Sequence, residues 1–309
     1  MMSAADRQAL AQVGGDAVAF DVPTARYTSL RVGGPADALA TPPDRRVLAA
    51  LLRACARRRI PHTVLGNGFN TVVRDGGLPG LAIRLNRFRG LDERPGSFLR
   101  AEAGVTHSAL TRFCRERGLS GLEFGAGIPG TVGGWIAMNA GVPQRELKDV
   151  VREVEALSPT GARRRHLGRR ALRFEYRALR GLAPGTVILS ALLAVRVADR
   201  EGVERAIAGH LAKRAGTQPL DQPSCGSVFK NPAGDYAGRL IEAAGLKGRR
   251  VGGAEISSLH ANFIVNRGGA TASDVLALIE LARDEVRRRS GVRLHTEVRV
   301  LGRAVGEAA

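Results

Sequence analysis

Cysteine and aromatic residues are scarce in this chain, and both shortages exclude classes of function. Three cysteines, Cys55, Cys114 and Cys225, occur among 309 residues, with no CxxC pair and no histidine-rich spacing. An odd number of isolated cysteines argues against a disulfide framework and a zinc site, so we expect reduced thiols and no metal site. Aromatic residues make up only 4% of the chain, which leaves few side chains to stack on nucleic-acid bases.

Long apolar runs are also missing. The longest nearly apolar run, residues 187–195, is much shorter than the roughly 20 residues that cross a membrane. The first 20 residues lack the basic start and the continuous apolar stretch of a signal peptide. We therefore expect a cytoplasmic protein without a membrane partner.

Lysine is nearly absent, although the chain carries a net charge of +18. Of the 47 basic residues only four are lysines and 43 are arginines, spread over nearly the whole length. Dispersed arginine is as typical of a coding bias as of a binding stripe, and no helix-turn-helix, RRM or KH pattern is present. We expect no nucleic-acid partner, because anionic small molecules account equally well for the charge.

The length and the periodicity predict more than one α+β unit. A chain of 309 residues exceeds the size at which a single hydrophobic core usually stops growing, so we expect two or three subdomains. The spacing of apolar residues predicts helices over residues 47–60, 108–117, 201–214, 236–244 and 272–290. Strands are predicted over residues 62–65, 81–85, 97–104, 187–198 and 294–302. We place a domain boundary near residue 200.

Two segments contain more glycine than surface turns need. LGNGFNTVV (residues 65–73) follows a predicted strand, and FGAGIPGTVGGWIAMNAG (residues 124–141) holds six glycines in eighteen residues. Neither is a GxGxxG fingerprint and no Walker lysine follows, so a Rossmann site and a P-loop are not supported. Each segment alone is equally typical of an Ω-loop. Together they favour a diphosphate cofactor lying between them.

A third segment, PSCGSVFKNP (residues 223–232), encloses hydroxyl, thiol, amine and amide groups between two prolines. It is either an ordinary turn or the small-residue wall of an active site. Gly226 allows close backbone approach, so the Ser227 hydroxyl can be held in a fixed place. We interpret Cys225 as a small buried side chain, because no histidine lies nearby in sequence to activate it.

Seven segments in order resemble the UDP-N-acetylenolpyruvoylglucosamine reductase family: GNGFNTVV, GAGIPGTVGGWIAMNAG, FEYR, PSCGSVFKNP, AGRLIEAAGLKG, HANFIVN and HTEVRVLG. The resemblance runs from about residue 27 to residue 302 and is to the shorter, second class of the family. It implies an FAD-binding domain of the vanillyl-alcohol-oxidase type over residues 1–200, built of two α+β subdomains that divide near residue 80. A C-terminal α+β substrate domain is implied over residues 201–304.

The resemblance also implies a reaction and its residues. NADPH reduces FAD, and the flavin delivers hydride to an enolpyruvyl ether, giving UDP-N-acetylmuramate for peptidoglycan precursor synthesis. Ser227 matches the proton donor, Arg177 the residue that binds the substrate carboxylate, and Glu297 a residue that stabilises or protonates the intermediate. Further substrate contacts are expected at Tyr176, Lys213, Lys230 and Asn231. Cofactor contacts are expected at Gly66, Asn67, Gly68, Asn70, Thr71, Gly127, Ile128, Pro129, Gly130, Thr131, Gly133, Gly134 and Asn139.

The sequence departs from the family pattern at two places, and two other functions stay open. Phe69 stands where a serine is expected, and Ala178 and Leu179 replace an aspartate and a serine. One alternative is another FAD-dependent oxidase of the same superfamily, which would not need the set Arg177, Ser227 and Glu297. The other is a basic binding protein without catalysis. We expect a monomer.

Overall fold

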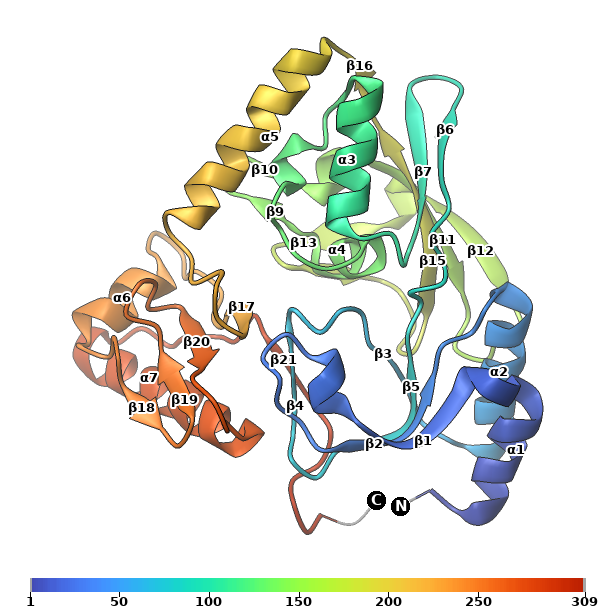
Figure 1. The fold of residues 1–309 in the computed structure, drawn as a ribbon, viewed down its shortest axis with the longest axis horizontal. Helices are drawn as coiled ribbons and strands as arrows, with labels where there is room; N and C mark the ends of the chain where they lie inside the picture. The colour runs from blue at the N-terminus through green and yellow to red at the C-terminus, as the bar shows by residue number, and fades with distance from the viewer. Residues whose placement is uncertain (1, 308–309) are drawn as a thin grey trace.

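Three sheets of four or five strands, joined by short two-stranded pairs, organise the chain (Figure 1). The structure is a computed structural model that describes residues 2–307. None of the helices within these residues is both long enough and apolar enough to span a membrane.

The first unit is a mixed sheet with the strand order β1-β2-β5-β3. Its elements are α1 (Ala4–Gly14), β1 (Val18–Pro23), β2 (Pro35–Ala40), α2 (Arg45–Arg58), β3 (His62–Val64) and β5 (Leu78–Ile83). Strands β2, β5 and β3 run parallel, while β1 is antiparallel to β2. The α2 helix begins after Asp44, whose side chain accepts from Val47 N, and it buries the apolar face that the sequence predicts. Figure 1 shows α1 and α2 side by side at the edge of this unit.

The second unit is an antiparallel sheet with the order β12-β11-β15-β7-β6. Its strands are β6 (Leu91–Arg94), β7 (Phe98–Glu102), β11 (Val151–Leu157), β12 (Arg164–Gly168) and β15 (Val187–Ala194), and its helices are α3 (His107–Arg117) and α4 (Val132–Met138). Two hairpins project from it, β9 (Gly141–Val142) with β10 (Arg145–Glu146) and β13 (Arg173–Glu175) with β14 (Ala178–Arg180). A further pair joins β8 (Leu119–Ser120) to β16 (Arg196–Val197). The first two sheets divide between Ile83 and Leu91, close to the subdomain boundary expected near residue 80.

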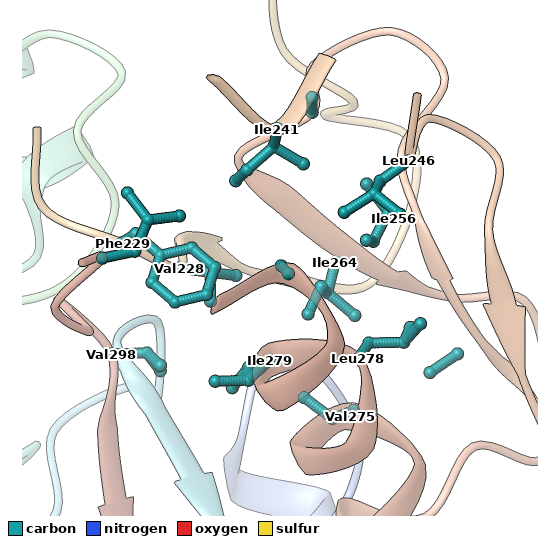
Figure 2. Packing of buried hydrophobic residues seen from close by; sticks show 14 of the residues in the cluster. Val228, Phe229, Ile241, Leu246, Ile256, Ile264, Val275, Leu278, Ile279 and Val298 are labelled. Atoms are coloured by element: carbon teal, nitrogen blue, oxygen red, sulfur yellow. The ribbon is translucent and has the colours of Figure 1, made fainter. Parts of the chain in front are cut away.

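The third unit is the antiparallel sheet β17-β20-β19-β18, with two helices packed on it. Its elements are β17 (Ser224–Ser227), α6 (Ala237–Ala243), β18 (Arg250–Val251), β19 (Ala254–Ile256), β20 (Phe263–Asn266) and α7 (Ala272–Ser290). The α7 helix spans the residues that periodicity predicts, because Thr271 and Asp274 form a capping box at its start and Gly291 (φ 72°) ends it. Figure 2 shows Val275, Leu278 and Ile279 of α7 in one buried cluster with Ile264 of the sheet.

Helix α5 (Arg200–Ala215) packs on the second unit, which bears on the domain boundary expected near residue 200. Its buried residues Val203 and Ile207 form a cluster with Ala126, from the second glycine-rich segment. After α5, the first residue that belongs to the apolar core of the third unit is Cys225. Packing therefore favours a boundary after α5 rather than before it.

The last predicted strand, residues 294–302, forms only in part. Strand β21 (Arg299–Leu301) pairs in parallel with β4 (Thr71–Val73), so the chain returns to the first unit, as Figure 1 shows. Before β21, Thr296 makes an isolated bridge with Phe229. The prediction of one continuous strand is wrong because this segment changes its pairing partner on passing from the third unit to the first.

Candidate active site

One cavity of about 900 Å³ is lined by residues from all three units. Its wall includes both glycine-rich segments, the tip of the β9–β10 hairpin, part of α5 and strand β17. This volume lies at the upper end of the range for small-molecule and cofactor sites. The cavity is therefore large enough for a dinucleotide-sized ligand.

Most of the cofactor contacts expected from the sequence line this cavity. They are Gly66, Asn67, Gly68, Asn70, Thr71, Gly127, Ile128, Pro129, Gly130, Thr131, Gly133 and Gly134. Gly68 has φ 67°, and a Cβ there would overlap the Tyr27 carbonyl oxygen, so only glycine fits. A Cβ on Gly133 would lie 2.9 Å from the Ala103 Cβ. These glycines bring two backbone segments to the cavity that larger residues would push away.

The wall fits a large polar cofactor of the FAD type. Three of its buried polar atoms have no hydrogen-bond partner among residues 2–307: Arg84 Nε, Asn86 Oδ1 and Gln222 Oε1. An unpartnered buried polar group costs free energy, so these atoms favour a polar ligand. At Gly66 a Cβ would find only the Thr131 Oγ1 within 4 Å, at 3.6 Å. The missing side chain leaves room for a ligand to approach the backbone.

Asn139 is the expected cofactor contact that does not line the cavity. Its side chain is fully buried and occupied by protein groups. The Nδ2 donates to Glu146 Oε2 at 2.9 Å and to the Glu175 carbonyl at 3.0 Å, and Oδ1 accepts from Lys148 N at 2.9 Å. Its backbone ends α4 in the left-handed region (φ 43°). The structure thus gives Asn139 a supporting place behind the wall rather than a place on it.

Ser227 lies on the cavity wall at the end of β17. The pairing of β17 with β20 shifts register between Ser224 and Ser227, and Gly226 within this bulge has φ 74°. Buried Asn262 fixes the next residues, because its Oδ1 accepts from Phe229 N at 2.9 Å and its Nδ2 donates to Phe229 O at 2.8 Å. The segment is an irregular strand that places Ser227 on the cavity wall.

Cys225 is buried, with 1% of its surface exposed. Burial raises the pKa of its thiol to about 12, so the thiol stays protonated at neutral pH. This fits the interpretation of Cys225 as a small packed side chain and argues against a thiolate nucleophile.

Arg177 lies at the tip of the β13–β14 hairpin with φ 56°, a conformation that non-glycine residues adopt at a cost and often at functional sites. Its guanidinium Nε is 3.2 Å from Glu297 Oε1, and its Nη1 is 3.5 Å from Glu146 Oε1. The Nη2 donates to the Gly141 carbonyl at 3.2 Å. The group also stacks on the Tyr176 ring, 4.9 Å from the ring centroid. These contacts hold the cation at the cavity edge.

Glu297 precedes β21 and is tied to both neighbouring segments. Its backbone N donates to the Val228 carbonyl at 2.8 Å, and its carbonyl accepts from Asn70 Nδ2 at 3.1 Å. Burial raises the pKa of its carboxyl, and the nearby Arg177 and Lys230 charges offset only part of that rise. A larger share of protonated carboxyl is therefore present here than on a surface glutamate.

The four expected substrate contacts fall into two places. Lys213 and Asn231 line the main cavity, whereas Tyr176 and Lys230 line a neighbouring pocket of about 420 Å³ that Asn231 also borders. Lys230 Nζ is 3.5 Å from the Tyr176 carbonyl. Arg293 adds a further positive side chain to the smaller pocket.

Several wall residues belong to no motif and were missed. Arg84 directly follows β5, at the carboxyl end of a parallel strand, where ligands commonly bind, so its position was a usable signal. Arg214 and Gln222 carry no comparable signal. Phe69, the residue that departs from the family pattern, lines the cavity with 38% of its surface exposed. With phenylalanine at this position, the first glycine-rich loop still lines the cavity.

Comparison with known proteins identifies the family. Residues 36–166 match the FAD binding domain, and residues 218–301 match the C-terminal domain of UDP-N-acetylenolpyruvoylglucosamine reductase. The chain is 50% identical to UDP-N-acetylenolpyruvoylglucosamine reductase of Anaeromyxobacter sp. (strain Fw109-5) over 91% of this chain and 88% of that protein. It is 44% identical to the enzyme of that name from Geotalea uraniireducens, over 92% of this chain and 93% of the relative.

A solved structure agrees. The crystal structure of UDP-N-acetylenolpyruvylglucosamine reductase from Thermus caldophilus matches with a TM-score of 0.79 and 37% identity, covering 92% of this chain and 98% of that one. The expected order of an FAD-binding domain and a C-terminal domain is confirmed. By sequence over nine-tenths of its length and by fold, the chain belongs to the UDP-N-acetylenolpyruvoylglucosamine reductase family.

Proposed function

We propose that Arg177, Ser227 and Glu297 carry the chemistry of this flavoenzyme, which uses NADPH and FAD to reduce UDP-N-acetylglucosamine enolpyruvate to UDP-N-acetylmuramate. The observation that supports these roles best is the Arg177–Glu297 pair, 3.2 Å apart, on the cavity wall that also holds Ser227 and the glycine-rich loops. The three residues come from three separate segments of the chain and meet only in the fold.

The reaction sets two requirements for the protein. FAD, when bound, supplies the hydride that NADPH provides and that adds to one carbon of the enolpyruvyl double bond. The electron pair of that bond then spreads from the other carbon into the adjacent carboxylate. The site therefore needs a cation at the carboxylate and a proton donor at the second carbon.

The proposed roles meet these requirements. Arg177 binds the substrate carboxylate, because its guanidinium is permanently charged and presents paired donors. Ser227 gives its hydroxyl proton to the second carbon. Glu297, whose pKa burial raises, donates a hydrogen bond in its protonated form without adding negative charge beside the intermediate. The product then carries the transferred hydride and the transferred proton on adjacent carbons.

Other residues are proposed to bind the two ligands. The twelve lining residues of the glycine-rich segments hold the cofactor. Lys213 and Lys230 are proposed to bind phosphate of UDP or NADPH, and Tyr176 and Asn231 to contact the UDP-sugar. The monomeric state and the cytoplasmic location expected from the sequence stay predictions.

An anaerobic spectral experiment tests the proposed function. The flavin bands of the purified protein should bleach on addition of NADPH and return on addition of UDP-N-acetylglucosamine enolpyruvate. Arg177→Lys should keep the first response and slow the second, because an ammonium cannot present the paired donors. A reduced flavin that ignores the enolpyruvyl sugar would refute the proposed function.

A further inference from the structure

A second carboxylate, that of Glu146, contacts the guanidinium that pairs with Glu297. Its Oε1 is 3.5 Å from Arg177 Nη1, and 13% of the Glu146 side chain is exposed. Glu146 lies at the base of the β9–β10 hairpin, opposite Gly141, and the Gly141 carbonyl accepts from Arg177 Nη2 at 3.2 Å. One hairpin base thus supplies two acceptors to the arginine from another hairpin.

Glu146 is itself held in place. Its Oε2 accepts from Asn139 Nδ2 at 2.9 Å and lies 2.7 Å from Lys148 Nζ. Its backbone N donates to Asp149 Oδ2 at 2.9 Å, which closes a capping box. Because two donors occupy Oε2, Oε1 is the oxygen that faces Arg177.

Asn139 connects this arrangement to the cofactor wall. It ends α4 and lies between Met138 and Ala140, which both line the cavity. Its side chain also donates to the Glu175 carbonyl at 3.0 Å, two residues before Arg177. A continuous set of contacts therefore runs from the second glycine-rich segment to Arg177.

A count of donors shows what these contacts leave for the substrate. A guanidinium has five N–H groups. Glu297 faces the one on Nε across an ion pair of 3.2 Å, Glu146 accepts one from Nη1, and the Gly141 carbonyl accepts one from Nη2. One N–H remains on each terminal nitrogen, and two parallel N–H groups are what a carboxylate binds in bidentate form.

We propose that Glu146, supported by Asn139, is a positioning residue that orients Arg177 so that its two remaining N–H groups face the substrate carboxylate. The inference rests on the carboxylate-binding role proposed for Arg177. Without Glu146 the guanidinium keeps the Glu297 pair, the Gly141 carbonyl and the Tyr176 ring, but it loses the contact that fixes its Nη1. The two remaining N–H groups then no longer face the substrate carboxylate, and the step that uses this carboxylate becomes slower.

Glu146→Gln tests the proposal, because it removes the charge and keeps the shape. The two half-reactions are measured separately by stopped-flow spectroscopy on the FAD-containing protein. Reduction by NADPH should match wild type, since the role proposed for Arg177 is to bind the carboxylate of the enolpyruvyl sugar. The second-order rate constant of reoxidation by UDP-N-acetylglucosamine enolpyruvate should fall about 10-fold to 100-fold, the scale of a misplacement near 1 Å.

Two further variants make the result specific. Glu175→Gln is the matched control, because Glu175 lies on the same hairpin as Arg177 and its exposed side chain pairs only with Arg180 among the described residues. Both half-reactions should stay at wild-type rates. Lys148→Met removes the 2.7 Å contact to Glu146 from a partly exposed side chain, so it should slow reoxidation in the same direction by a smaller factor. Lys148→Met replaces Glu146→Gln as the test if Glu146→Gln fails to fold.

The possible outcomes separate the inference from the proposed function. Wild-type reoxidation in Glu146→Gln and Lys148→Met, or equal slowing of both half-reactions, would overturn the positioning role. If Arg177→Lys slows reoxidation while Glu146→Gln does not, the inference alone fails. If wild-type reduced flavin is not reoxidised by the enolpyruvyl sugar, the proposed function fails and the inference fails with it.

Discussion

Asp75 is predicted to anchor the third unit to the first. It lies in the loop after β4, and its carboxylate accepts from Ala272 N at 2.8 Å, Ser273 N at 2.9 Å and Ser273 Oγ at 2.6 Å. These groups belong to the first turn of α7, almost 200 residues away in sequence. A carboxylate at this end of a helix satisfies free N–H groups and complements the helix dipole.

The size of the effect follows from these contacts. Asp75→Ala leaves two backbone N–H groups of α7 without their carboxylate, while the Thr271 cap of the helix stays intact. Because Asp75 is partly exposed, water replaces some of the lost hydrogen bonding, and the cost should be about 1–2 kcal/mol, as for other helix caps. For a chain of 309 residues that corresponds to a fall in Tm of about 1.5–3 °C.

The effect should depend on pH. Partial burial opposes ionisation of Asp75, but hydrogen bonds from Ser273 and Ala272 outweigh it and lower the pKa of its carboxyl. Because the pKa is lower in the folded state, ionised Asp75 stabilises the protein fully at pH values above its unfolded-state pKa of about 3.9. This stabilisation is lost as the pH falls through the folded-state pKa. The test is thermal unfolding of wild type, Asp75→Ala and the uncharged control Asp75→Asn. The difference in Tm between wild type and the variants should be full at pH 7 and smaller below about pH 4. An unchanged Tm in Asp75→Ala, or a difference that persists at low pH, would refute the reasoning.

Three further predictions follow from single sites. The three cysteines are buried, and burial raises the pKa of these thiols to about 11 or 12, so the folded protein should resist alkylation at pH 8 until it is denatured. Gly68→Ala should lose bound flavin, seen in the flavin-to-protein absorbance ratio, while Gly209→Ala, which has open space around its Cβ, should keep it. Because burial raises the pKa of Glu297, reoxidation by substrate should slow as pH rises through that pKa, and Glu297→Gln, which keeps a neutral hydrogen-bond donor, should lose this slowing at high pH. An unchanged pH profile in Glu297→Gln would contradict its role.

The sequence predicts elements best where the signal is local. The limits of α7 are marked by Thr271, Asp274 and Gly291, and its apolar residues repeat at helical spacing, so the helix could be placed to the residue. The packing of α5 could not be predicted, because its partner, Ala126, lies 77 residues before Val203. The strand at residues 294–302 was overextended for a similar reason, since its pairing partners lie in two different units.

The candidate site shows the same limit. Glycine-rich segments could be found because glycine marks close backbone approach, and most of their residues line the cavity. Glu146 and Asn139 could not be given their supporting place from the sequence, because that depends on which way two hairpins face. Lys213 and Lys230 were both expected to contact the substrate, and the fold places them in different pockets.

The central claim is that Ser227 delivers the proton that completes reduction, and stopped-flow comparison of wild type with Ser227→Ala tests it most directly. NADPH should bleach the flavin of both proteins at the same rate. The enolpyruvyl sugar should then restore the flavin bands of the variant about 10²-fold to 10⁴-fold more slowly, the usual contribution of a positioned proton donor. Restoration at the wild-type rate, or equal slowing of both steps, would contradict the account.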